Sequence, residues 1–246
     1  MARRRFFVDE FHNHRAEVSG DDAHHLTRVL RVERGQQYEV CDSSAAWLAT
    51  VVEAHKARVV FELKEPVAAK PAFAPLTLYV ALFKFDHLEW IVEKGTELGV
   101  ESFHFVIAER SERGLERAAD KRIERWRKIA LESSQQSRRD RLPNLHEPVR
   151  LRDAALHAAG VKLLLDESGG APLLGVLGAQ GRTVSGVSLL TGPEGGWADR
   201  EREFLLGSGW SAVTLGPSIL RAETAAIAAI AVVQSSFLTS NVIEAQ

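Results

Sequence analysis

The sequence predicts an α/β protein in two parts, a small β-rich module followed by a larger domain with a mostly parallel sheet. Three observations support this class. Short segments rich in β-branched and aromatic residues precede residue 66, three of the eight prolines fall within residues 66–75, and strand and helix patterns alternate after them. We therefore place a boundary in the proline-rich segment, with one domain at residues 1–70 and the other at residues 74–246.

The N-terminal module contains three expected strands, at residues 37–41, 47–53 and 58–63. Turn-like stretches separate them, as is typical of a small all-β unit. Residues 24–32 are the one segment of the module with a helical pattern.

The larger domain begins with a buried strand at residues 76–83. Asp86 with Glu89 three residues later resembles a capping box, and Gly99 marks the end of the helix that it opens. Further strands are expected at residues 103–107, 161–165, 187–190 and 212–215, and further helices at residues 120–137, 200–206 and 222–237. Such alternation predicts a parallel sheet covered by helices on both faces.

Composition excludes several classes of protein. A single cysteine, Cys41, excludes an intramolecular disulfide and a zinc site built from several cysteines. The longest apolar run, residues 224–233, is half of the roughly 20 residues that a membrane span needs. The N-terminus has no apolar stretch typical of a signal peptide. We expect a cytoplasmic protein with no membrane segment and no metal.

Charge is unevenly distributed along the chain. The formal net charge is −2, yet residues 110–150 carry more lysine and arginine than acidic residues. A local basic face of this kind can bind nucleic acid. The alternative is a solvated helix with ion pairs between successive turns, and we prefer it for Arg122, Arg125 and Arg127.

Two loops that follow short apolar strands are the strongest candidates for a ligand site. We call residues 190–196 (LTGPEGG) the Pro193 loop and residues 215–224 (LGPSILRAET) the Arg221 loop. Ligands of open parallel sheets bind beyond the carboxyl ends of the strands, and glycines allow close approach of the backbone. Taken singly, each loop could be an ordinary tight turn. Residues 207–212 match the dinucleotide fingerprint G-x-G-x-x-A, but they lead from a helix into a strand, which is the wrong context.

Together the two loops resemble the RsmE family of the SPOUT methyltransferases. Segments 25–35, 89–100, 109–111 and 125–143 are similar to further motifs of that family, in the same order. The resemblance implies an N-terminal PUA-like β-barrel and a C-terminal SPOUT-type α/β domain with a deep trefoil knot. It also implies a homodimer that uses S-adenosyl-L-methionine (SAM) to methylate N3 of a uridine in 16S ribosomal RNA, within the small ribosomal subunit.

The resemblance assigns SAM to the two loops. The cofactor-binding residues that it implies are Leu190, Thr191, Gly192, Glu194, Gly195, Gly196, Leu215, Gly216, Ile219, Leu220 and Arg221. For catalysis, we expect Arg221 to stabilise negative charge on the uracil carbonyls, and Glu223 to orient the base or Arg221 or to accept the proton. Glu223 could instead be an acid that only complements the dipole of the last helix.

Contact with RNA is expected mainly at phosphates. The candidate residues are Arg3, Arg4, Arg5, Arg28, Arg31, Arg110, Arg113, Arg138 and Arg141.

Three positions depart from the family's usual pattern: Ser218 replaces an arginine, Gln135 a glutamate, and Phe85 a smaller residue. Rival interpretations are a methyltransferase that modifies a ribose or another base, a non-catalytic RNA-binding protein and a nucleotide-dependent oxidoreductase. The apolar helix at residues 222–237 is expected to be buried, either within one subunit or between two.

Overall fold

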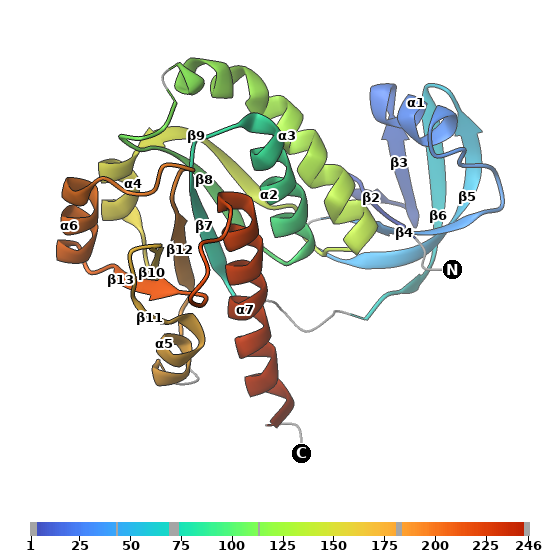
Figure 1. Cartoon of the computed structure of the whole chain (residues 1–246). Helices are drawn as coiled ribbons and strands as arrows, with labels where there is room; N and C mark the ends of the chain where they lie inside the picture. Colours follow the sequence, from blue (N-terminus) through green and yellow to red (C-terminus); the bar gives the residue numbers. More distant parts are fainter. Residues whose placement is uncertain (1–3, 43, 69–73, 113, 181–183, 244–246) are drawn as a thin grey trace. The chain divides into compact units, whose positions relative to one another are not determined.

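The computed structural model describes residues 4–42, 44–68, 74–112, 114–180 and 184–243 of the chain. The chain divides into two compact units, which are coloured by sequence in Figure 1. The first consists of Met1–Pro71 together with Ser134–Leu142, and the second of Ala72–Ser133 together with Pro143–Gln246. The two units are therefore not two continuous stretches of sequence, because the chain returns to the first unit at Ser134–Leu142.

A six-stranded sheet forms the first unit, in the order β1-β4-β5-β6-β3-β2. Its strands are β1 (Arg5–Phe7), β2 (Phe11–His12), β3 (Arg15–Ser19), β4 (Gln37–Cys41), β5 (Ala46–His55) and β6 (Arg58–Pro66). The pairs are antiparallel except for β1 with β4. In β3, Ala16 and Val18 are buried between exposed neighbours, so one face of the strand packs on the core. The expected β-rich module is confirmed.

Helix α1 covers Gly20–Arg28, four residues earlier than the pattern predicted. Ser19 occupies the N-cap with extended backbone, and Asp21 and Asp22 lie in the first turn, where negative charge is favourable. Arg31 adopts a left-handed backbone conformation with φ of 53°, so the helix cannot continue to residue 32.

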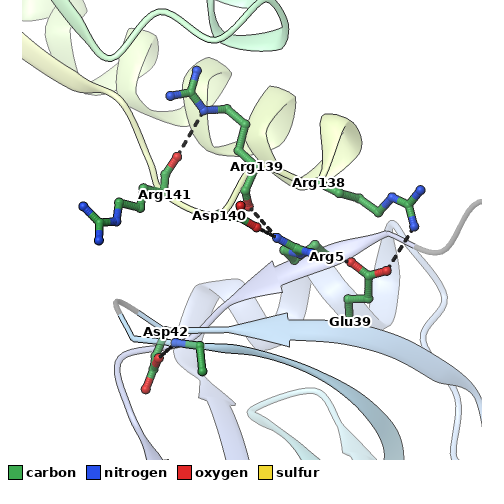
Figure 2. A network of polar contacts seen from close by, with 8 residues as sticks. Arg5, Glu39, Asp42, Arg138, Arg139, Asp140 and Arg141 are labelled. Carbon is green, nitrogen blue, oxygen red and sulfur yellow. Dashed lines mark hydrogen bonds and ion pairs between the residues drawn. The ribbon is translucent and has the colours of Figure 1, made fainter. Parts of the chain in front are cut away.

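A buried ion network connects β1 and β4 with the segment Ser134–Leu142 inside the first unit (Figure 2). The Arg5 side chain is fully buried, and its Nε and Nη2 lie 3.0 and 2.9 Å from Oε2 of Glu39. Its Nη1 pairs with Asp140 and donates to the carbonyl of Arg139 at 3.2 Å. The other oxygen of Glu39 accepts from Nη1 of Arg138 at 3.0 Å. Burial alone would lower the pKa of Arg5, but the hydrogen bonds to Asp140 and Glu39 outweigh it and raise the pKa.

The second unit is built on a seven-stranded sheet in the order β11-β13-β10-β12-β7-β8-β9, with every neighbouring pair parallel. Its strands are β7 (Leu76–Ala81), β8 (Ser102–Ile107), β9 (Asn144–Arg150), β10 (Val161–Leu165), β11 (Ala171–Pro172), β12 (Val187–Thr191) and β13 (Ser211–Thr214). The mostly parallel sheet expected from the alternating pattern is confirmed.

Helices cover both faces of this sheet (Figure 1). The residues that pack on one face come from α2 (Phe85–Glu97), α3 (Leu115–Ser137), α5 (Leu173–Ala179) and α7 (Ala222–Ile243). Those on the other face come from α4 (Leu151–His157) and α6 (Asp199–Gly207). Strand β7 contributes Leu78 and Val80 to the first core and Tyr79 and Ala81 to the second, which explains its continuous apolar sequence.

Several elements were not expected from the sequence, among them the edge strand β9 and the short helices α4 and α5. Most residues of β9 are exposed or half-buried, so the strand lacks the apolar run by which the inner strands were found. The interpretation of residues 207–212 as a turn is confirmed, because α6 ends at Gly207 and β13 begins at Ser211. No helix in the described part of the chain is long and apolar enough to cross a bilayer.

Candidate functional site

A cavity of about 520 Å³ lies at the carboxyl ends of β10, β12 and β13 in the second unit. Leu165, Thr191 and Thr214, the last residues of those strands, line it. Because parallel strands end at the same edge of a sheet, the loops that follow them gather there. The volume is within the range of about 300–1,000 Å³ that small-molecule sites occupy.

The Pro193 loop forms one wall, and its glycines are needed for close approach. A Cβ atom at Gly192 would lie 3.0 Å from the Trp197 ring. Gly196 has a φ of +68°, and a Cβ there would lie 2.4 Å from a carboxylate oxygen of Glu167. The indole Nε1 of Trp197 donates to the carbonyl of Leu165 at 3.0 Å, which holds the loop against the end of β10. The backbone of the Pro193 loop therefore forms this wall of the cavity, and Trp197 fixes the loop to the end of β10.

The Arg221 loop forms the facing wall and contributes apolar surface. Ile219 and Leu220 line the cavity although they are 80% and 38% exposed. Large apolar side chains left open beside a cavity are typical of a ligand site. Arg221 also lines the cavity, and its carbonyl accepts from the backbone amide of Ala225 at the start of α7 at 2.8 Å.

A cluster of charged side chains lies beside the cavity, where α2, α7 and the Pro193 loop meet. Nδ1 of His87 is 3.4 Å from Oε2 of Glu223 and 3.5 Å from Oε1 of Glu194. Lys84 places its Nζ 3.3 Å from the same oxygen of Glu194. Glu223 is buried in the first turn of α7, whereas Lys84 and Glu194 are open to solvent. The cavity thus has both acidic and basic groups at one end.

Two acidic residues follow β10 and line another part of the wall. Asp166 is buried and paired with Arg202, whose Nε lies 2.6 Å from Oδ2, and this hydrogen bond raises the pKa of Arg202. Glu167 is exposed and borders both the cavity and Gly196. Asp166 therefore holds α6 in place, and Glu167 is available to a ligand.

The family model for an RNA methyltransferase domain matches residues 70–234, and the model for an RNA methyltransferase PUA domain matches residues 18–64. A ribosomal RNA small subunit methyltransferase E from Synechocystis sp. is 34% identical over 85% of this chain and 69% of its own length. The chain belongs to the ribosomal RNA small subunit methyltransferase E family. The expected RsmE resemblance is confirmed.

Two solved structures from this fold family are similar over almost the whole chain. The family member from Neisseria gonorrhoeae, bound to S-adenosyl methionine, has a TM-score of 0.85 and 28% identity, and the match covers 95% of this chain and 98% of that one. A methyltransferase from Legionella pneumophila in complex with SAM has a TM-score of 0.86 and 26% identity, covering 96% and 98%. The expected fold class is confirmed, and the trefoil knot stays a prediction from the resemblance.

Most of the residues that the family resemblance assigned to the cofactor lie around the cavity. Those in its lining are Thr191, Gly192, Glu194, Gly196, Leu215, Gly216, Ile219, Leu220 and Arg221. Leu190 is outside the lining, and its side chain is buried in the core beneath α4 and α6, so its assignment to the cofactor stays a prediction. Gly195 is also outside the lining, and its carbonyl accepts from Nη1 of Arg110 at 2.8 Å.

Other lining residues were not expected from the sequence, including Lys84, His87, Asp166 and Glu167. They follow the carboxyl ends of β7 and β10. The rule that pointed to the two glycine-rich loops applies equally to these strand ends, and applying it to every strand would have found them.

The arginines expected to contact RNA have different surroundings. Arg28, Arg31 and Arg141 are exposed, and Arg4 is half-buried. Arg5 and Arg138 belong to the ion network with Glu39, and the side chain of Arg5 is fully buried whereas that of Arg138 is 35% exposed. Contact of these two residues with RNA stays a prediction. Arg110 is exposed and holds the Pro193 loop, while Arg3 and Arg113 lie outside the described residues.

The three helix arginines are ion-paired, but of the three only Arg127 pairs between successive turns of α3, because Glu89, the partner of Arg122 and Arg125, lies on α2. Arg125 donates to both oxygens of Glu89 at 2.6 and 2.7 Å, and Arg122 donates to the same carboxylate at 3.2 Å. Arg127 pairs with Glu124. These side chains belong to a solvated face of α3.

Proposed function

We propose that this protein transfers a methyl group from SAM to N3 of a uridine in 16S ribosomal RNA. The observation that carries the proposal is the cavity of about 520 Å³ between the Pro193 and Arg221 loops, in a chain of the ribosomal RNA small subunit methyltransferase E family. Relatives of the same fold hold SAM, which supports the choice of cofactor.

The residues around the cavity fit such a cofactor. A side chain at Gly192 would crowd the Trp197 ring, and one at Gly196 would be strained by the φ of +68°, so a ligand there would meet backbone amides and carbonyls. Ile219 and Leu220 offer apolar contact to an adenine ring. Glu167 and Glu194 offer carboxylates to hydroxyl, ammonium or sulfonium groups. The residues proposed to hold SAM are Thr191, Gly192, Glu194, Gly196, Leu215, Gly216, Ile219, Leu220 and Arg221.

When bound, SAM supplies an activated methyl group to a nucleophile held in line with it. Uracil N3 carries a proton and lies on the pairing edge of the base, so the uridine must be unpaired or flipped out of its stack. The proton must also leave. Arg221 lines the cavity and would stabilise the negative charge that develops on the uracil carbonyls.

Glu223 is the candidate for the proton acceptor. Its carboxylate is buried beside the cavity, in the first turn of α7, and faces His87. The same position would let it orient the base or Arg221. Its place in the first turn also complements the helix dipole, whatever its part in catalysis.

The proposed partners are ribosomal RNA and a second copy of the chain. Arg4, Arg28, Arg31 and Arg141 would contact RNA phosphates, and Arg110 would support the cofactor loop. The half-buried apolar side chains of α7 would form the contact between two copies of the chain, as the family resemblance implies. A substrate within the ribosomal subunit would place the protein in the cytoplasm.

Product mapping tests the reaction. The protein is incubated with labelled SAM and, in separate reactions, with small ribosomal subunits, free 16S RNA and transfer RNA, and the products are mapped by mass spectrometry. We expect one 3-methyluridine in 16S RNA. A methyl group on a ribose or on another base would contradict the proposed position, and failure to bind SAM in calorimetry would support a non-catalytic RNA-binding protein.

An Arg221→Ala variant tests the catalytic role of the guanidinium. At saturating RNA and SAM, we expect the rate of a single turnover to fall by about 10²–10³-fold, the usual cost of losing one group that stabilises developing charge. Arg152→Ala, on α4 at the other face of the sheet, is the matched control and should keep the rate of the unaltered protein. A wild-type rate for Arg221→Ala would rule out the role.

A further inference from the structure

His87 has a buried nitrogen that faces two carboxylates and makes no hydrogen bond to any described residue. Its side chain is 19% exposed at the first turn of α2. Two aromatic rings border the imidazole: Trp90 stacks at 5.9 Å with an interplanar angle of 22°, and Phe83 meets it edge-on at 6.3 Å. A buried polar nitrogen of this kind costs stability unless it gains a partner during function.

Besides the two aromatic rings, charged groups from α2, α7 and the Pro193 loop surround the imidazole. Glu223 comes from α7 and Glu194 from the Pro193 loop, at 3.4 and 3.5 Å from Nδ1. Asp86 lies on the solvent side, with Oδ2 3.9 Å from Nε2 and a side chain that is 77% exposed. Lys84 and Arg221 complete the charged lining of this end of the cavity. One ring nitrogen therefore faces the buried carboxylate, and the other faces the exterior.

We propose that His87 is a proton relay that carries the proton of the acceptor base from Glu223 to solvent. The inference rests on the proposed function, in which Glu223 receives that proton. Because His87 acts through Glu223 and not on the base itself, it is a positioning and relay residue for the proposed reaction.

The proton leaves the uracil in three transfers. The N3–H bond of the uracil breaks as its proton moves to a carboxylate oxygen of Glu223, and the electron pair left on N3 forms the new bond to the methyl group. The Glu223 O–H then gives its proton to Nδ1 of His87. Nε2 of the resulting imidazolium releases a proton to water on the side of Asp86. Glu223 is again a carboxylate, and His87 is a neutral imidazole with its proton on Nδ1. Exchange with water, which takes the proton from Nδ1 and returns one to Nε2, restores the starting tautomer for the next turnover.

Other groups near Glu223 are less suited to this step. Lysine and arginine side chains are protonated at neutral pH and cannot accept a proton, which excludes Lys84 and Arg221. Glu194 is 43% exposed and belongs to the cofactor wall. Imidazole is the side chain that ordinarily changes protonation near neutral pH and can take a proton on one nitrogen while it releases one from the other. His87 therefore has both the position and the chemistry to accept the proton from Glu223.

Two variants of the full-length protein test the relay. His87→Ala opens a space for a small base, and His87→Gln keeps most of the volume but cannot carry a proton. We expect both to lower the multiple-turnover rate about 10²-fold at saturating SAM and 16S RNA, because Glu223 keeps its proton after the first turnover, and this is the lower end of the range for losing acid–base assistance. SAM affinity, measured by calorimetry, should stay within a factor of three of wild type. His157→Ala, an exposed histidine at the end of α4, is the matched control and should keep the wild-type rate.

Chemical rescue separates a relay from a merely structural role. Added imidazole should restore the rate of His87→Ala in a saturable manner and should have little effect on the wild type or on His157→Ala. A rate for His87→Gln equal to wild type would overturn the relay, as would a loss of rate in His87→Ala that imidazole cannot restore. If either variant unfolds, the other is decisive, because rate and rescue are measured only on folded protein. If wild type makes no 3-methyluridine, the proposed function fails first, so the two failures are distinguishable.

Discussion

At the scale of single residues, His104 shows how burial changes the chemistry of an ordinary side chain. It lies on β8, stacked on His146 at 4.0 Å and on Tyr79 at 4.7 Å. Burial lowers the pKa of His104 to about 4, and repulsion from His146 contributes in the same direction. The folded protein therefore keeps this imidazole neutral at pH values where an unfolded chain would protonate it.

This difference predicts a pH-dependent stability. The unfolded state binds a proton at His104 near pH 6.5 and the folded state only near pH 4, so the free energy of unfolding falls as pH decreases through this window and levels off below it. A His104→Phe variant keeps the ring stack and removes the titration. Urea unfolding at several pH values should show a shallower slope between pH 6.5 and 4 in the variant. Equal slopes would show that His104 does not contribute.

Single residues also determine the shape of the cavity wall formed by the Pro193 loop. Gly192 and Gly196 are the positions at which a Cβ atom would meet Trp197 or Glu167, so the backbone itself forms the wall. Ser218 lines the cavity at a position where the family resemblance led us to expect an arginine. Arg221 is therefore the arginine of the described lining. Lys84 is the other cationic side chain of the lining, so positive charge at this site comes from Lys84 and Arg221.

At the scale of elements, the buried Arg5 network decides how the segment Ser134–Leu142 joins the first unit. Arg5 is in β1, Glu39 in β4, and Arg138 and Asp140 follow the end of α3. Arg138 has a left-handed backbone with φ of 56°, which ends the helix and turns the chain. A buried charge pair of this kind is costly to break, because one partner then stays desolvated without compensation.

Replacing Arg5 tests this arrangement. An Arg5→Met variant removes the guanidinium but leaves Arg138 paired with the buried Glu39, so we expect the free energy of unfolding to fall by about 3 kcal/mol, the lower end of the range for a buried charge that loses its partner. Arg58→Met, which removes exposed ion pairs with Glu17 and Glu53, is the control and should change stability little. Chemical denaturation measures both. Similar effects for the two variants would contradict a structural role specific to Arg5.

At the scale of the whole molecule, RNA binding is expected to depend on exposed arginines from separate parts of the sequence. Arg28 is the last residue of α1, Arg31 lies just beyond the end of that helix, and Arg141 follows α3. Each phosphate contact releases counterions from the RNA, so affinity should fall as salt concentration rises.

The salt dependence can be measured residue by residue. Filter binding of 16S RNA across a range of salt concentrations should give a steep negative slope of log affinity against log salt. We expect Arg31→Ala to reduce the magnitude of that slope by roughly one unit. Arg152→Ala should leave it unchanged. A flat response in the wild type would contradict an extensive phosphate contact.

Assembly is a second property of the whole molecule. On α7, Ala226, Ala229 and Ile230 are buried in the core, whereas Ile227 and Ala231 are half-buried, so an apolar surface remains. Light scattering should measure twice the chain mass of 27.2 kDa. An Ala231→Glu variant should shift the mass toward one chain, because a desolvated carboxylate opposes the contact. A monomeric wild type would contradict the dimer.

Local sequence patterns were sufficient for the fold class and for the two loops. Apolar runs identified the inner strands of the parallel sheet, because strands such as β12 are buried on both faces. Glycine and proline after β12 and β13 marked the ends where a ligand site was expected. The dismissal of residues 207–212 as a nucleotide motif also needed only the order of helix and strand.

The sequence by itself therefore determined the class of fold, the family and the two walls of the cavity. Only the tertiary structure decided that His87 lies between Glu194 and Glu223, that Asp166 pairs with Arg202, and that Arg5 is buried. The physical reason is the distance along the sequence between the residues that interact. Helix and strand periodicity depends on neighbours within a few residues, whereas these pairs join groups far apart in the sequence and depend on which side chains the packed sheet brings together.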